Sequence, residues 1–98
     1  MSVSTHVLDT EAGEPAAGIE VALFRGDELI SLRETDEDGR IGELAPGGLQ
    51  PGEYRIVFHL GGGFFEKVEL TIAIADPRSH YHVPLLVSPY ACVTYRGS

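Results

Sequence analysis

The 98-residue sequence contains little of several residue types that would point to particular classes of protein. It has one cysteine, Cys92, so no disulfide can form within the chain, and a reducing compartment fits best. Basic residues are few, with seven Lys and Arg against fifteen Asp and Glu and a formal net charge of −8. Because binding to phosphates needs clustered Lys and Arg, this balance argues against a nucleic-acid partner.

Long apolar runs are also missing from the sequence. No stretch approaches the roughly 20 residues of a membrane-spanning helix. The N-terminus has no basic region followed by an apolar stretch, so we expect no signal peptide. With 43% hydrophobic residues, the composition is globular rather than disordered. We therefore expect one soluble, cytoplasmic domain over residues 1–98, small enough to gain stability from association with copies of itself.

Alternation of apolar and polar residues is the main pattern that is present, and it predicts β-strands. In "EYRIVFHL" (53–60) every second residue from Tyr54 is apolar, and "KVELTIAIA" (67–75) alternates in the same way. No window shows a sustained helical period. Turns rich in Gly, Pro and Asp separate these segments from further expected strands, which are residues 4–10, 18–24, 29–35, 80–88 and 90–96.

Six to eight short strands with turns between them predict an all-β domain, either a two-sheet sandwich or a small barrel. Pro84 falls inside the expected strand 80–88. Because proline cannot donate a hydrogen bond to a neighbouring strand, we expect this strand to lie at a sheet edge there, or to be bulged.

Taken one at a time, the residues capable of chemistry do not define a site. No serine lies in a Gly-x-Ser-x-Gly motif. Cys92 lies in an apolar strand, where a lone cysteine is usually a packed core residue. The three glycines at 61–63 lack the Lys and Ser or Thr of a phosphate-binding loop and predict a hairpin turn instead.

Two histidines, His80 and His82, are spaced so that they point to the same face of a strand. Together they could ligate a metal ion, but a third ligand would have to come from His6 or His59 on another strand. For such a pair, one satisfied and one exposed histidine is the more common arrangement.

Four stretches taken together resemble the transthyretin-related 5-hydroxyisourate hydrolases. They are "THVLDTEAGEPAAGIEVALF", "TDEDGRI", "HYHVPLLVSPY" and the terminal "TYRGS", and they occur in the order typical of that family. The terminal Tyr-Arg-Gly-Ser is the most specific of them, because it marks the hydrolases and is absent from the hormone carriers of the same superfamily.

The resemblance implies a transthyretin-like, two-sheet β-sandwich that assembles as a homotetramer with its active sites at the dimer–dimer interface. It implies hydrolysis of 5-hydroxyisourate, the product of urate oxidation, to 2-oxo-4-hydroxy-4-carboxy-5-ureidoimidazoline. It also implies the site residues, with no metal and no cofactor. The catalytic residues would be His6, Arg40, His82 and Ser98, and the substrate would be bound by His6, Arg40 and Tyr95.

These residue types suit the opening of a ring amide. A base must take a proton from the attacking water, and imidazole titrates near neutrality. The permanently charged guanidinium of Arg40 can stabilise the developing oxyanion or hold a flat, oxygen-rich ring. Either His82 or His6 could be the base, with the other orienting the water, and the sequence leaves that choice open.

The sequence also departs from the family pattern. Family members usually carry a longer segment with a short helix between the strand written here as "YRIVFHL" and the two phenylalanines. Here "GGGFF" joins the two directly, so we expect that helix to be lost or reduced to a turn.

Three alternatives to the hydrolase stay open. A transthyretin-like carrier of small ligands would keep the fold but lack the set of histidines and arginine, which is complete here. A β-sandwich interaction module, such as an adhesion or carbohydrate-binding domain, would give Ser98 no role. A metal-dependent hydrolase would use His80 and His82 and would lose activity with a chelator.

Overall fold

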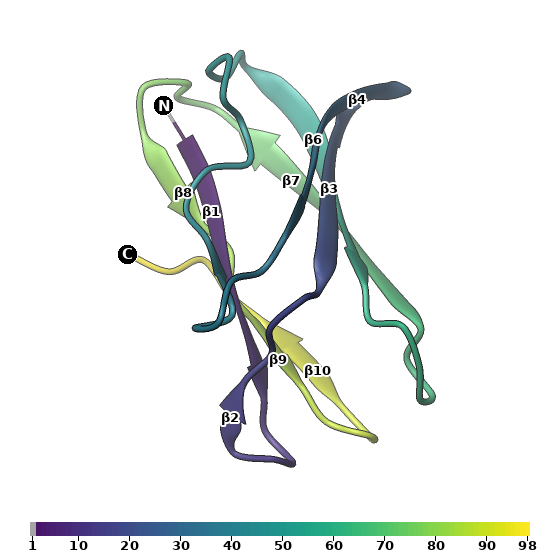
Figure 1. Ribbon diagram of the computed structural model, residues 1–98. Coiled ribbons are helices and arrows are strands. Elements are labelled where there is room, and N and C mark those ends of the chain that lie inside the picture. The colour runs from purple at the N-terminus through teal and green to yellow at the C-terminus, as the bar shows by residue number, and fades with distance from the viewer. Residues whose placement is uncertain (1) are drawn as a thin grey trace.

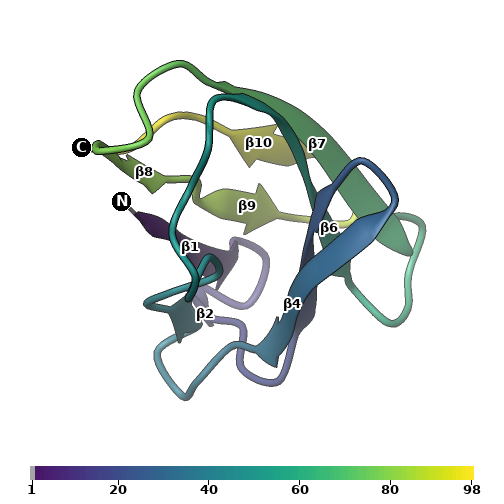
Figure 2. The same cartoon turned by 90° about the horizontal axis from the view of Figure 1, so that it is seen from above.

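The computed structural model describes residues 2–98, whose regular elements are β-strands arranged in two sheets (Figures 1 and 2). The first sheet is antiparallel, in the order β4-β3-β6-β7. Its strands are β3 (Glu20–Arg25), β4 (Glu28–Glu34), β6 (Gly52–His59) and β7 (Lys67–Ile74).

The second sheet is built around β1, which pairs with four short strands, and a fifth, β10, joins the sheet through β9. Its order is β10-β9-β1-β2, and β5 and β8 also pair with β1. The strands are β1 (Ser2–Asp9), β2 (Glu14–Pro15), β5 (Arg40–Ile41), β8 (His80–His82), β9 (Leu85–Val87) and β10 (Cys92–Thr94).

The expectation of an all-β, two-sheet sandwich is thus confirmed. No helix occurs among the described residues, which include the segment where the family's short helix was expected to be lost. Residues 60–66 instead form the connection between the antiparallel strands β6 and β7, closed by a 2.8 Å hydrogen bond from the Leu60 amide to the Glu66 carbonyl. Residues 2–98 accordingly contain no helix of the length and hydropathy needed to span a bilayer.

The core lies between the sheets and follows the alternation in the sequence. On β6, Tyr54, Ile56 and Phe58 are buried, as the period of two predicts. Val57, expected on the outer face, is also only 4% exposed, because β6 is an inner strand and Ala22 of β3 lies beside it in register. The second sheet contributes the opposite half of this core, chiefly Val3, Val7, Tyr81, Val83 and Leu85.

Pro84 interrupts the expected strand 80–88. The segment divides into β8 and β9, and both pair in parallel with β1. Pro84 lies between them, and its carbonyl accepts a 2.8 Å hydrogen bond from the Thr94 hydroxyl. The prediction of a single edge or bulged strand is therefore wrong here, because a residue without an N–H ends one strand and a second begins after it.

Candidate active site

The outward face of β1 carries the polar residues of the candidate site. Val3, Thr5 and Val7 are buried toward the core, so the alternating positions Ser4 and His6 lie on the other face. This face is lined on both sides by neighbouring strands, which explains why Ser4 is only 8% exposed although it points away from the core.

Strand register brings the predicted residues next to β1. Arg40 of β5 is the Cα partner of His6, and His82 of β8 is the partner of Ser4. Their chain neighbours Ile41 and Tyr81 are buried in the core. Arg40 and His82 therefore lie on the same outer face as Ser4 and His6, on opposite sides of β1.

A tight turn fixes the start of β5 and with it the position of Arg40. Asp36 accepts hydrogen bonds through Oδ1 from the Asp38 and Arg40 amides, both at 2.9 Å. Gly39 has φ of 75° and packs against β1 so closely that a Cβ would collide with the Val7 carbonyl oxygen. Asp38 and Gly39 thus form one of the turns rich in Gly and Asp that the sequence predicts between strands, and only glycine fits its last position.

The end of the chain is held against β8. The Gly97 amide donates a 2.7 Å hydrogen bond to the His82 carbonyl, in an antiparallel bridge. Both views of the ribbon show the C-terminal end beside β8 (Figures 1 and 2). The guanidinium of Arg96 lies 4.4 Å from the centre of the Tyr81 ring and adds a cation–π contact. A terminus that would otherwise fray is thereby attached to the strand that carries His82.

These elements enclose a polar hollow of about 360 Å³. Arg40, His82 and Ser98, three of the four residues expected to be catalytic, line it. The other lining residues are Ser4, Thr5, Ile41, Gly42 and His80. His6, the fourth, does not line it but stands beside Arg40 in register and contributes to the electrostatic field at His82.

Glycine is required at position 97 because the terminal backbone lies against the imidazole. A Cβ there would be 2.6 Å from His82 Cδ2, well inside contact distance. We expect Gly97→Ala to push the chain end away and break the Gly97–His82 hydrogen bond, so that the amide at position 97 exchanges about tenfold faster with deuterium. Hydrogen–deuterium exchange measures this directly. Gly62→Ala, where a Cβ meets nothing within 4 Å, is the matched control; equal exchange at position 97 in both variants would contradict the contact.

The pKa of His82 is lowered from its ordinary value of 6.5, chiefly because partial burial disfavours the charged ring. The positive charge of Arg40 is the second cause, followed by His80 and His6. His82 is therefore neutral at pH 7. Its Nδ1 lies 2.7 Å from the Ser4 hydroxyl, so Nε2 is the ring nitrogen left to accept a proton from water.

His6 is placed differently. Its Nε2 lies 2.8 Å from the Asp38 carbonyl oxygen, and because a carbonyl only accepts, Nε2 must carry the proton. That nitrogen cannot serve as a base while the bond is kept. The lone pair of the His6 ring is then on Nδ1, so what favours His82 as the base is its place in the lining of the hollow, which His6 does not share.

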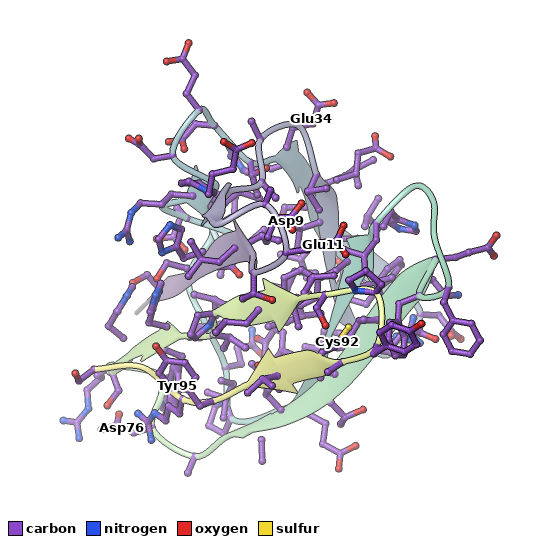
Figure 3. All side chains as sticks on the ribbon, turned by 90° about the horizontal axis from the view of Figure 1, so that it is seen from below. Asp9, Glu11, Glu34, Asp76, Cys92 and Tyr95 are labelled. Atoms are coloured by element: carbon purple, nitrogen blue, oxygen red, sulfur yellow. The ribbon has the colours of Figure 1, made fainter. Side chains whose placement is uncertain are left out.

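Tyr95 is not brought to this hollow within the chain. It is 58% exposed and lies just beyond β10 on the C-terminal segment (Figure 3). It lines a separate hollow of about 280 Å³ that also includes residues 70–73 of β7. Cys92, on β10, packs against the core, and burial raises the pKa of its thiol, in keeping with the structural role expected from the sequence (Figure 3).

A larger cavity, of about 720 Å³, lies elsewhere and is a weaker candidate for chemistry. It opens beside the connection 60–66 and is lined mostly by apolar side chains, among them Phe64 and Phe65. Its only titratable carboxylates are Asp9 and Glu11, at the end of β1 and in the turn that follows (Figure 3). Neither histidine nor arginine lines it, whereas the smaller hollow has both.

Two residues of the polar hollow, Ser4 and His80, were not expected to take part in it. The sequence contained one signal for each: Ser4 precedes His6 by two positions, and His80 precedes His82 by two, so each pair shares a strand face. Within residues 2–98 no group of three or more His, Cys, Asp or Glu side chains gathers in a way that could hold a metal ion.

Comparison with known proteins gives the site its context. The model of the HIUase/Transthyretin family matches residues 3–97. A 5-hydroxyisourate hydrolase 2 of Rhizobium meliloti (strain 1021) is 46% identical, over 98% of this chain and 95% of its own. That alignment extends over 114 residues, more than the 98 of this chain, so the relative has residues without a counterpart here.

Solved structures show the same fold. The 5-hydroxyisourate hydrolase of Klebsiella pneumoniae superposes with a TM-score of 0.92 at 31% identity, covering 99% of this chain and 98% of that one. Sea bream transthyretin in complex with thyroxine superposes with a TM-score of 0.85 at 25% identity, covering 99% and 95%. The chain therefore belongs to the HIUase/Transthyretin family.

Proposed function

We propose that this protein hydrolyses 5-hydroxyisourate to 2-oxo-4-hydroxy-4-carboxy-5-ureidoimidazoline, a step in the degradation of urate. The observation that carries the proposal is the placement of Arg40, His82 and the terminal Ser98 around one polar hollow. The family and the names of the relatives, which are 5-hydroxyisourate hydrolases, point to the same substrate.

The hollow suits a small bicyclic substrate. Its volume of about 360 Å³ lies at the small end of ligand pockets, which run from about 300 to 1,000 Å³. Arg40 and His82 flank β1 from opposite sides, so a flat ring over the strand would have a guanidinium at one edge and an imidazole at the other.

In the proposed mechanism, His82 acts as the general base. Its free Nε2 removes a proton from a water molecule, which attacks the ring amide carbonyl. Arg40 stabilises the oxyanion that develops on that carbonyl, since a guanidinium stays charged and donates two parallel hydrogen bonds. His6 orients the substrate or water beside Arg40, and Ser98 hydrogen-bonds the heterocycle. No covalent intermediate is formed.

Tyr95 requires a second subunit if it is to contact substrate. The proposed homotetramer supplies one: β7 and β10 each have one edge without a strand partner within residues 2–98, and Tyr95 lies between them. Light scattering on the purified protein tests the tetramer. A cytoplasmic location is part of the same proposal, in keeping with the single free cysteine.

The lowered pKa of His82 predicts the pH dependence of the reaction. A base works in its neutral form, which for His82 persists below pH 6.5. The enzymatic rate should therefore stay level through neutral pH and decline only as the solution is acidified below 6.5. The measurement is the initial rate at pH 5 to 8 with the spontaneous rate subtracted; a decline that begins well above pH 6.5 would contradict it.

The activity itself is tested with freshly generated 5-hydroxyisourate, whose absorbance loss is followed with and without protein. We expect a large acceleration that persists in the presence of a chelator, because no metal takes part in the proposed mechanism. Sea bream transthyretin, which shares the fold, is the matched control. If 5-hydroxyisourate is lost no faster with the protein than in buffer alone, the proposed function is wrong.

A further inference from the structure

A single hydroxyl lies between two imidazoles at the edge of the polar hollow. Ser4 Oγ is 2.7 Å from His82 Nδ1 and 2.9 Å from His80 Nε2. A serine hydroxyl has one proton to donate, so it can donate to one ring and must accept from the other. The protonation of the two rings is therefore linked through Ser4, and neither can change alone without losing a hydrogen bond.

The row of groups continues from the hollow to the surface. His82 is partly buried beside the chain end, whereas His80 is exposed, and its Nδ1 contacts the Ser2 hydroxyl. The connected atoms thus run from His82 Nε2, through Ser4, to a ring that is in contact with solvent.

We propose that Ser4 and His80 are positioning residues that together relay a proton away from His82. The inference rests on the proposed function for its catalytic meaning, but the linkage between the rings can be tested without any substrate. At rest, His82 carries its proton on Nδ1 and donates it to Ser4, and Ser4 donates to His80 Nε2.

The relay conserves every proton. When His82 Nε2 takes a proton from water, its Nδ1 proton passes to Ser4 Oγ, and the original hydroxyl proton of Ser4 passes to His80 Nε2. His80, now an imidazolium, returns its Nδ1 proton to solvent. His82 is left neutral with a proton on Nε2. When Nε2 gives this proton to the ring nitrogen that leaves, the relay runs in reverse: His80 Nε2 returns a proton to Ser4, Ser4 returns one to His82 Nδ1, and His80 Nδ1 regains a proton from solvent.

The charges around His82 explain why such a relay would help. Burial opposes a positive charge on this ring, and Arg40 on β5, His80 on β8 and His6 on β1 all oppose it further. An imidazolium at His82 is therefore costly, whereas the same charge on exposed His80 is solvated by water. Passing a proton on to His80 lets His82 act as a base without keeping the positive charge itself.

Histidine NMR on the substrate-free protein tests the linkage. Long-range ¹H–¹⁵N correlations distinguish the two neutral tautomers, and above pH 7 we expect His82 to carry its proton on Nδ1. Ser4→Ala should convert this to a mixture of both tautomers, and Ser4→Thr, which keeps a hydroxyl, should restore it. An identical His82 tautomer in wild type and Ser4→Ala would overturn the relay.

Measured rates of hydrolysis test whether the relay contributes to catalysis. His80→Gln keeps an amide able to hydrogen-bond Ser4 but cannot pass a proton, and we expect the rate of 5-hydroxyisourate hydrolysis to fall about tenfold. Ser4→Ala should lower the rate by a similar factor, and Ser4→Thr, which keeps the hydroxyl, should recover part of the loss. His59→Gln changes an exposed histidine of the other sheet and is the matched control.

The outcomes separate the two proposals. A rate for His80→Gln equal to that of His59→Gln would overturn the relay while leaving the hydrolase intact. If the wild-type protein shows no activity, the proposed function is wrong. The tautomer of His82 would still decide whether the protonation of His82 and His80 is linked through Ser4.

Discussion

Replacing His82 by asparagine is expected to lower the rate of 5-hydroxyisourate hydrolysis by about 10²- to 10⁴-fold, the usual contribution of a general base. Asparagine can keep a hydrogen bond to Ser4 in place of the Nδ1 contact of 2.7 Å, but it cannot take a proton from water at neutral pH. Initial rates at saturating substrate measure the effect.

His59→Asn is the control for this experiment, because His59 is exposed at the end of β6, in the other sheet. It should keep the full rate. Circular dichroism should show the same β-sheet spectrum for both variants. A His82→Asn protein that is folded and within a few-fold of wild type would rule out His82 as the base and return the choice to His6.

Removal of the charge at Arg40 is the second change with a large expected effect. Arg40→Gln should lower the rate by about 10²- to 10³-fold, the cost of losing a donor to a developing oxyanion. It should also move the acid limb of the pH–rate profile to higher pH. Burial is the main reason that the pKa of His82 is low, but the charge of Arg40 is the next, so its loss must raise that pKa.

Arg33→Gln is the matched control, since Arg33 is an exposed arginine on β4 of the other sheet. It should change neither the rate nor the profile. Arg40→Lys keeps the charge but loses the planar fork, so it should restore the pH profile more fully than the rate. If Arg40→Gln lowers the rate without moving the acid limb, the electrostatic coupling of Arg40 to His82 is wrong.

The strands could be predicted largely from the sequence, because a sheet with one buried face requires alternation. Tyr54, Ile56 and Phe58 follow that rule and form the middle of the core. Alternation does not predict whether a residue on the outer face of a sheet is buried or exposed. Val57 is buried because of the strands on either side of β6, and strand neighbours are not encoded in a period of two.

The candidate site was found from motifs and could not be derived residue by residue. His6, Arg40 and His82 are far apart in the chain, and their proximity depends on the register of β5 and β8 with β1. Sequence reasoning also treated His80 as a potential metal ligand, whereas its ring nitrogen contacts the Ser4 hydroxyl. The role of Tyr95 depends on assembly, which the alternation within one chain does not encode.

The central claim is that the substrate binds in the polar hollow between β5 and β8 rather than in the larger apolar cavity. A crystal structure with urate, the parent heterocycle of the substrate, tests this most directly. We predict the ring over β1, with Arg40 and His82 Nε2 at hydrogen-bond distance from its oxygens or nitrogens. Urate bound instead among Phe64, Phe65 and Leu60, with the polar hollow holding only water, would contradict the account.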